Sequence, residues 1–330
     1  MNAKKVVTMV LASVMAIGVF AAPASAEVIL KYSETNSMDS TDGKYAQFFK
    51  DKVAELTDGE VVIDVQASGV LGTEADVLDG MVSMSGTVDI VRMSCYAFSN
   101  YGCNKSALLG LPFIFESSDH FWNFAHSEVG QEILNEPAEN NLGVTGLFYL
   151  EDGFRSFFFT KPVEGIDDLK DKKLRVSSDQ IMTGLCKGLG ASATVVNFNE
   201  LYTSLQSGVV DGAEQPITPY ASNAFNEVAP YMLLDEHTMA TSSVVIADMS
   251  LDKLTPEQQD ALFEAGKATE EYARELCKED IENCMKELEE KGVTFIEVPD
   301  KTPYREACAD LIAQFTSGIE DTYQAILDLA

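Results

Sequence analysis

Arginine is scarce in this sequence, and its placement gives the strongest chemical signal. Five arginines occur among 330 residues. Arg92, Arg155 and Arg175 each lie in a short apolar segment, whereas Arg274 and Arg305 lie in polar helical patterns. A guanidinium among apolar side chains needs a carboxylate, which either the protein or a ligand can supply. Because its planar fork holds a carboxylate through two parallel hydrogen bonds, the three arginines predict a site for an organic anion. Pairing with an Asp or Glu of the chain is an equally good explanation for any single one.

A second candidate group lies in residues 199–216. Asn199 can cap a helix, which Gly208 can end, and a brief strand then reaches Gln215 just before Pro216. Proline cannot continue a strand, so Gln215 is expected at a strand end. Its amide can both donate and accept hydrogen bonds there.

The elements that must position these residues alternate between strands and helices. The sequence predicts strands at 28–32, 61–65, 89–93, 174–176 and 193–196, and helices at 43–55, after Thr73 and at 180–188. This repeated βαβ order indicates α/β lobes with mainly parallel sheets. In such sheets, ligands bind beyond the carboxyl ends of the strands.

The C-terminal part is predicted to be mostly helical. Residues 255–258 form a capping box with proline at the first helical position, and the helical pattern continues to Lys291 before Gly292. A helix of this length can cross from one lobe to the other. A short strand at 295–298 and a closing helix at 304–329 follow.

The first 26 residues indicate an exported protein. Two lysines precede an apolar run, and Ala24-Ser25-Ala26 suits a cleavage site, so residues 1–26 are expected to be a secretory signal peptide rather than a membrane anchor. Without them, the 23 basic residues fall to 21 against 53 acidic ones, a net charge of −32. Nucleic acid is therefore not an expected partner.

Six cysteines lie in the exported part, where disulfides can form. Cys95 and Cys103 flank a short polar segment and are the most plausible pair. Cys277 and Cys284 lie two turns apart on one helix, too far to bond each other, so either pairs with Cys308 or stays free. The spacing of a zinc site is absent from the sequence, and no metal or other cofactor is expected.

Several segments together resemble a known family. They are Gly69–Gly72, Leu111–Phe115, Gly153–Arg155, Lys173–Val176, Gly190–Ala191 and Phe198–Glu214. Each is weak alone, but their order and spacing resemble the substrate-binding proteins of TRAP transporters, the DctP family. The resemblance extends over nearly the whole chain after the signal peptide.

The resemblance implies a fold. It is an α/β, two-lobed, periplasmic-binding-protein-like fold of class II type, with a long C-terminal helix crossing between the lobes. Lobe I would comprise residues 27–152 plus about 241–280, and lobe II residues 153–240 plus about 281–330. The cleft between them would close on a ligand that bears a carboxylate.

The resemblance also implies roles for individual residues. Arg175 would clamp the ligand's carboxylate, with Arg155 as a second cation. Phe198 would pack against the ligand's apolar face. Gln215 stands where the family commonly has Asn, a departure that adds a methylene and shifts the amide. These assignments agree with the organic-anion site that the three arginines in apolar segments predict.

Two residues of the first lobe complete the predicted site. Arg92 lies in a segment resembling the sugar-acid-binding subgroup and would contact the ligand, and Glu34 would accept hydrogen bonds from sugar hydroxyls. A sugar acid such as a hexuronate fits this set, and a C4-dicarboxylate or a keto acid is the alternative.

The implied function is transport. The chain would act in the periplasm as a monomer that binds a small organic acid and delivers it to TRAP-type permease subunits. A sensing module for a membrane receptor is a second possibility from another class. Catalysis is not expected, because none of the three histidines adjoins a nucleophile motif such as GxSxG.

Overall fold

The computed structural model describes residues 27–330, and the predicted signal peptide, 1–26, lies outside the described residues. One nine-stranded sheet extends through the molecule in the order β2-β1-β3-β8-β4-β7-β5-β6, with β9 paired to β8. The strands are β1 (Val28–Ser33), β2 (Val61–Gln66), β3 (Ile90–Ser94), β4 (Val144–Phe159), β5 (Lys173–Val176), β6 (Ser192–Val195), β7 (Gly212–Gln215), β8 (Tyr231–Ala247) and β9 (Thr294–Glu297).

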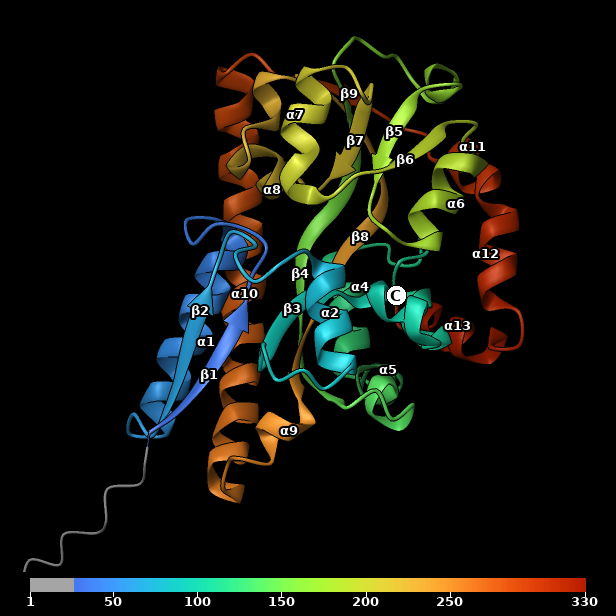
Figure 1. The fold of residues 1–330 in the computed structure, drawn as a ribbon. Coiled ribbons are helices and arrows are strands. Elements are labelled where there is room, and N and C mark those ends of the chain that lie inside the picture. Colours follow the sequence, from blue (N-terminus) through green and yellow to red (C-terminus); the bar gives the residue numbers. More distant parts are fainter. Residues whose placement is uncertain (1–26) are drawn as a thin grey trace, which may run out of the picture.

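Two long antiparallel strands, β4 and β8, connect the lobes (Figure 1). The first lobe is built on β1–β3 and the second on β5–β7, and within each lobe β1 or β5 pairs in parallel with its neighbours. The prediction of mainly parallel sheets therefore holds for the outer strands but is wrong at the centre, where β4 pairs antiparallel with both β7 and β8.

A bulge interrupts the β4–β8 pairing where the chain passes between the lobes. The register shifts between Glu151 and Phe154, and Gly153 in this stretch has a φ of +79°. A bulge bends a strand and re-aims the side chains beside it. A Cβ on Gly153 would lie 2.5 Å from Cδ1 of Ile281, so the glycine also lets the long helix behind the sheet approach closely.

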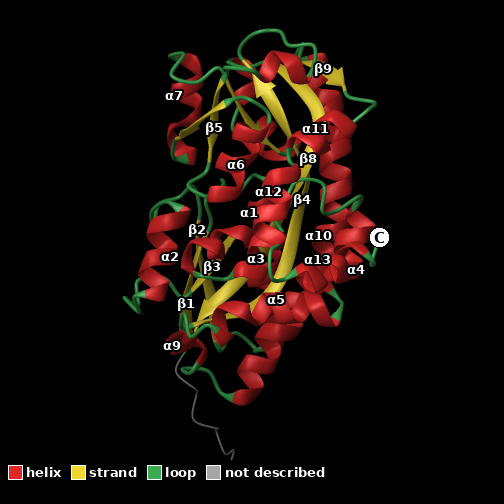
Figure 2. Cartoon of the chain, turned by 90° about the vertical axis from the view of Figure 1, so that its right-hand side faces the viewer, coloured by secondary structure: helices red, strands yellow, loops and turns green. Residues whose placement is uncertain are grey.

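Helices cover the sheet of each lobe (Figures 1 and 2). Those before the crossing strand β4 are α1 (Thr41–Leu56), α2 (Glu74–Val82), η1 (Cys95–Tyr101), α3 (Asn104–Leu108), α4 (Ser118–Ala125) and α5 (Glu128–Glu139). Those between β4 and β8 are η2 (Ile166–Leu169), α6 (Gln180–Gly188), η3 (Phe198–Glu200), α7 (Leu201–Gln206), α8 (Ile217–Ser222) and η4 (Phe225–Glu227). After β8 come α9 (Asp248–Leu251), α10 (Pro256–Glu290), α11 (Thr302–Ala307), α12 (Ala309–Thr316) and α13 (Glu320–Leu327).

The predicted long helix is α10, which runs for 35 residues without interruption. Its capping box is formed, with the Thr255 side chain accepting from Gln258 N and the Gln258 side chain accepting from Thr255 N. The helix packs on α1 and β4 in the first lobe and then on α8 in the second (Figure 1). It therefore crosses between the lobes, as predicted.

The closing segment differs from the single helix predicted at 304–329. It is divided into α11, α12 and α13, and Gly318 with a φ of +86° separates the last two. The last turn returns to the first lobe, where Nε2 of His120 lies 2.8 Å from the Ile326 carbonyl and Asn123 donates to the Leu329 carbonyl. Residues 281–330 thus contact both lobes.

All six cysteines of the described chain are free thiols, so the predicted Cys95–Cys103 disulfide is wrong. Cys95 begins the short helix η1 and Cys103 follows its end, and their side chains pack in different apolar clusters. Cys277 and Cys284 are unbonded, and so is Cys308. Within residues 27–330, no helix has the length and apolar character needed to cross a bilayer.

Candidate functional site

The predicted binding residues meet in a cavity between the lobes. Its volume is about 160 Å³, which admits one small molecule. Five of the six predicted site residues line it: Arg92 from β3, Arg155 from β4, Arg175 from β5, Gln215 from β7 and Phe198 from η3. Glu34 is fully buried and does not line the cavity. Strand ends from both lobes therefore converge on one site, as the α/β order predicts.

The edges of the two lobes are in contact around this cavity. Nδ2 of Asn223 lies 3.4 Å from Oδ1 of Asn36, and Nδ2 of Asn100 donates to the Ser178 carbonyl at 3.0 Å. Each bond joins a residue of the first lobe to one of the second. The two lobes therefore touch each other beside the cavity.

Arg175 is the cation whose charge the protein leaves unmatched. It is 3% exposed, its Nε donates to the Val196 carbonyl at 2.9 Å, and within residues 27–330 no carboxylate lies within ion-pair distance of it. Burial lowers the pKa of its guanidinium, opposed by the nearby Glu214. A buried cation without a counter-ion is costly unless an anion arrives.

Phe198 and Gln215 adjoin Arg175 in the second lobe. The guanidinium carbon of Arg175 lies 5.9 Å from the centre of the Phe198 ring, a cation–π distance that helps fix the arginine. Gln215 lies opposite Ser156, one residue after Arg155, and its side-chain amide makes no hydrogen bond within the described chain. The amide is thus available to a ligand in the cavity.

Arg155 is already paired with a carboxylate. Its Nε donates to Oε2 of Glu214 and its Nη2 donates to Oε1 at 2.9 Å. Burial raises the pKa of the Glu214 carboxyl. The Arg155 guanidinium and the adjacent His237 imidazole outweigh burial and lower this pKa to about 2. The pair leaves only Nη1 of Arg155 without a partner among the described residues, so this arginine has one donor nitrogen for a ligand.

His237 extends this buried ion network away from the cavity. Its Nδ1 lies 2.8 Å from Oδ2 of Asp235, and its Nε2 lies 3.8 Å from Oε2 of Glu214. Burial lowers its pKa, but the two carboxylates outweigh burial and raise it to about 9. The imidazolium therefore stands behind Glu214, which in turn holds Arg155.

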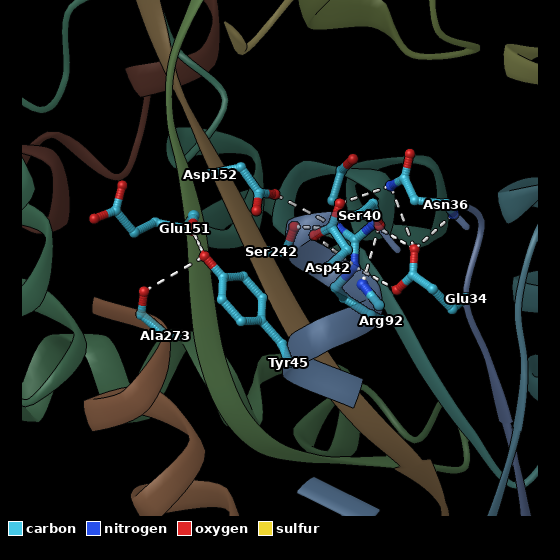
Figure 3. A network of polar contacts seen from close by, with 12 residues as sticks. Glu34, Asn36, Ser40, Asp42, Tyr45, Arg92, Glu151, Asp152, Ser242 and Ala273 are labelled. Carbon is cyan, nitrogen blue, oxygen red and sulfur yellow. Dashed lines mark hydrogen bonds and ion pairs between the residues drawn. The ribbon is translucent and has the colours of Figure 1, made fainter. Parts of the chain in front are cut away.

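Arg92 is also matched, by carboxylates of the first lobe (Figure 3). Its Nε and Nη2 donate to the two oxygens of Glu34 at 2.7 and 2.8 Å, and its Nη1 donates to Ser242 at 2.9 Å. Asp42 lies 3.2 Å from Nε, and Asp152 lies 3.8 Å from Nη1. Glu34 therefore holds the Arg92 side chain in place. The predicted contact of Glu34 with ligand hydroxyls stays a prediction.

Asp42 and Asp152 line the cavity and were missed by the sequence analysis. Asp42 lies in the first turn of α1, which Ser40 caps, and Asp152 lies in the β4 bulge. Burial raises the pKa of both carboxyls, while Arg92 lowers it. Asp152 directly precedes the recognised Gly153–Arg155 segment, which was the one available signal. Among 53 acidic residues, neither aspartate stood out.

Comparisons with known proteins identify the family of this chain. The family model for DctP, described as "Bacterial extracellular solute-binding protein, family 7", matches residues 32–318. The chain is 32% identical over 264 residues to the solute-binding protein RD1_1052 of Roseobacter denitrificans, covering 80% of this chain and 79% of that protein.

Two solved structures share the fold closely. A TRAP periplasmic solute-binding protein of Xanthobacter autotrophicus Py2 with bound β-D-galacturonate is 30% identical, with a TM-score of 0.86 over 91% of this chain and 99% of that one. Another, from Pseudomonas putida F1 with bound D-glucuronate, is 26% identical, with a TM-score of 0.87 over 91% and 96%. The two-lobed fold predicted from the sequence is confirmed.

Proposed function

This chain belongs to the DctP family of bacterial extracellular solute-binding proteins, and from that premise we propose that it captures a hexuronate or related sugar acid and delivers it to a TRAP-type membrane permease. The location is the periplasm, in keeping with the family, and residues 1–26 act as the export signal. The chain serves as a carrier and catalyses no reaction.

The observation that carries this proposal is the unmatched charge of Arg175. The other two cavity arginines have carboxylate partners in the protein, Glu34 for Arg92 and Glu214 for Arg155. Among residues 27–330, the partners of the Arg175 guanidinium are only a backbone carbonyl and the Phe198 ring. A ligand carboxylate therefore meets two free guanidinium nitrogens at Arg175, in the geometry that suits a bidentate pair.

The neutral polar groups beside Arg175 support a hydroxylated acid. Gln215 offers both a donor and an acceptor, and Nη1 of Arg155 offers a further donor. The related proteins with bound galacturonate and glucuronate carry ligands of this class. Each charge-assisted hydrogen bond contributes about 1.5–3 kcal/mol, so two or three of them support micromolar binding after ordering costs.

Closure of the cleft is the mechanism of capture. The ligand contributes contacts to both lobes only when they meet, so binding stabilises the closed form over the open one. The Asn36–Asn223 and Asn100–Ser178 bonds at the edges add to the stability of that form. The closed shape is then what the permease recognises.

A ligand screen with a matched pair of arginine variants tests the proposal. We expect D-galacturonate or D-glucuronate to raise the melting temperature, because ligand at 100 times its dissociation constant stabilises the native state by about 2.7 kcal/mol. Arg175→Ala should abolish the shift. Arg305→Ala removes an arginine that lies outside the cavity, against Phe113, and should leave the shift intact.

Two results would contradict the proposal. One is a folded protein that responds to no sugar acid, and the other is an Arg175→Ala variant that responds like the parent chain. A response to ligand without uptake of that ligand in cells carrying the permease would instead favour the receptor-sensing function.

A further inference from the structure

The first-lobe wall of the cavity gathers three carboxyl groups around one cation. Glu34, Asp42 and Asp152 surround the single cation Arg92, with nitrogen–oxygen distances of 2.7, 3.2 and 3.8 Å (Figure 3). All four side chains are at least nine-tenths buried. One guanidinium faces three carboxyl groups, and burial raises the pKa of Asp42 and Asp152 while Arg92 lowers it. The second-lobe wall differs, because within residues 27–330 no carboxylate lies within ion-pair distance of Arg175 there.

Two oxygens of this wall lack hydrogen-bond donors. Within residues 27–330, Oδ1 of Asp42 and Oδ1 of Asp152 are buried and have no hydrogen-bond partner. Arg92 donates hydrogen bonds to Glu34 and Ser242, its Nε lies 3.2 Å from Oδ1 of Asp42, and the Asn36 amide donates to the other oxygen of Asp42 at 2.7 Å. A buried acceptor without a donor destabilises the protein, so each oxygen calls for a donor from a bound molecule. Both aspartates line the cavity.

The cavity is thus polar from end to end. A cation at the second lobe suits a ligand carboxylate, and unpartnered carboxylate oxygens at the first lobe suit hydroxyl groups that donate. A second ligand carboxylate supplies no donor at neutral pH and is repelled by the acidic wall. The wall therefore separates hydroxylated monocarboxylates from dicarboxylates, the two classes that the sequence alone left open.

We propose that Asp42 and Asp152 determine ligand selectivity, accepting hydrogen bonds from the hydroxyls of a sugar acid and excluding molecules with a carboxylate at both ends. This inference rests on the proposed function, because it takes Arg175 as the holder of the first carboxylate. It adds the residues that choose among the organic acids that Arg175 accepts.

A matched pair of ligands isolates the charge of the second end. D-Galactonate and galactarate are open-chain acids with the same hydroxyl configuration. At the end opposite the shared carboxylate, D-galactonate has a primary alcohol and galactarate has a second carboxylate. Calorimetric titration at pH 7 should give a dissociation constant for galactarate about 100-fold higher than for D-galactonate, given the repulsion between buried like charges. D-Galacturonate serves as the reference ligand.

Neutral isosteres of the aspartates test the assignment. In Asp152→Asn, and separately in Asp42→Asn, the preference should fall to about 10-fold or less, because the new amide removes a charge and supplies a donor. Asp119→Asn removes a charge from an exposed residue outside the cavity and should leave the preference unchanged. Melting curves establish that each variant is folded, and either aspartate variant suffices if the other does not fold.

The outcomes separate the two proposals. If D-galacturonate does not bind, or binds independently of Arg175, the proposed function fails. If it binds through Arg175 while the parent chain accepts galactarate as well as D-galactonate, the selectivity inference alone is overturned. An unchanged preference in the folded asparagine variants also overturns it.

Discussion

Nδ1 of the buried His237 lies 2.8 Å from Oδ2 of Asp235, and this contact leaves the other ring nitrogen directed to Glu214. Asp235 itself is held by the backbone, since its Oδ1 accepts a hydrogen bond from Phe157 N at 3.1 Å. The chain from Asp235 through His237 and Glu214 to Arg155 therefore links the interior of the second lobe to the cavity.

Stability should depend on pH through His237. Its pKa is raised to about 9 in the folded protein, against about 6.5 when unfolded. Its contribution is fully present below pH 6.5 and is lost as the pH rises through 9, amounting to about 3 kcal/mol. Urea unfolding between pH 6 and 10 measures this loss. The variant His237→Gln should show a flatter profile over the same window, and an equally steep one would show that another group titrates.

Glu214→Gln should weaken both folding and binding. The change leaves Arg155 without its counter-charge, and removing one partner of a buried ion pair costs about 3–5 kcal/mol. We expect a lower urea midpoint and a freed Arg155 side chain that no longer presents Nη1 to the cavity. Calorimetry against D-galacturonate measures the second effect. Equal affinity of the variant and the parent chain for D-galacturonate would show that Arg155 does not contact the ligand.

Arg175→Lys should bind the ligand more weakly although it keeps the charge. Lysine lacks the planar fork, so one of two charge-assisted hydrogen bonds is lost, about 1.5–3 kcal/mol. This corresponds to a dissociation constant roughly 10- to 100-fold higher. If the Arg175→Lys variant binds the ligand as tightly as the parent chain, the contact is with a point charge and is not bidentate.

The inter-lobe contact of Asn100 should slow ligand release. Asn100→Ala removes the bond to the Ser178 carbonyl, worth about 0.5–1.5 kcal/mol, and we expect roughly 2- to 10-fold faster dissociation of labelled galacturonate. The control is Asn135→Ala on α5, whose amide bonds only within its own helix, to Gln131. Identical release rates for the two variants would show that the Asn100–Ser178 hydrogen bond does not slow ligand release.

Gly153→Ala should destabilise the protein at the β4 bulge. The φ of +79° disfavours alanine, and the new Cβ would lie 2.5 Å from Ile281, so a loss of roughly 1–3 kcal/mol is expected. Gly165→Ala is the matched control, because that residue has an extended φ and open space around it. Equal melting temperatures would show that the bulge relaxes freely.

The cysteines allow a direct test of the corrected disulfide prediction. Five of the six are buried, and only Cys284 is partly exposed. A thiol reagent should therefore label Cys284 first in the native protein and all six after denaturation without reductant. Four thiols after denaturation would indicate a disulfide and contradict the structure.

The sequence by itself determined the parts that depend on local patterns. Capping residues and apolar periodicity located α10 and its Thr255–Gln258 cap, the βαβ order predicted strand ends at a cleft, and the motif segments brought Arg175, Phe198 and Gln215 to one site. The helix and strand signals are short-range, because they follow from backbone hydrogen bonding and side-chain spacing along one element, whereas the grouping of the three site residues came from the resemblance to the DctP family.

Only the tertiary structure decided which charges are matched. The pairing of Arg92 with Glu34 and of Arg155 with Glu214 joins residues 58 and 59 positions apart, and no local pattern specifies such partners. The same holds for the antiparallel centre of the sheet, the broken closing helix and the placing of Asp42 beside Asp152. Burial and ion pairing depend on where the folded chain brings distant residues, so the surroundings of Arg175 and the grouping of the first-lobe carboxyl groups emerge only in three dimensions.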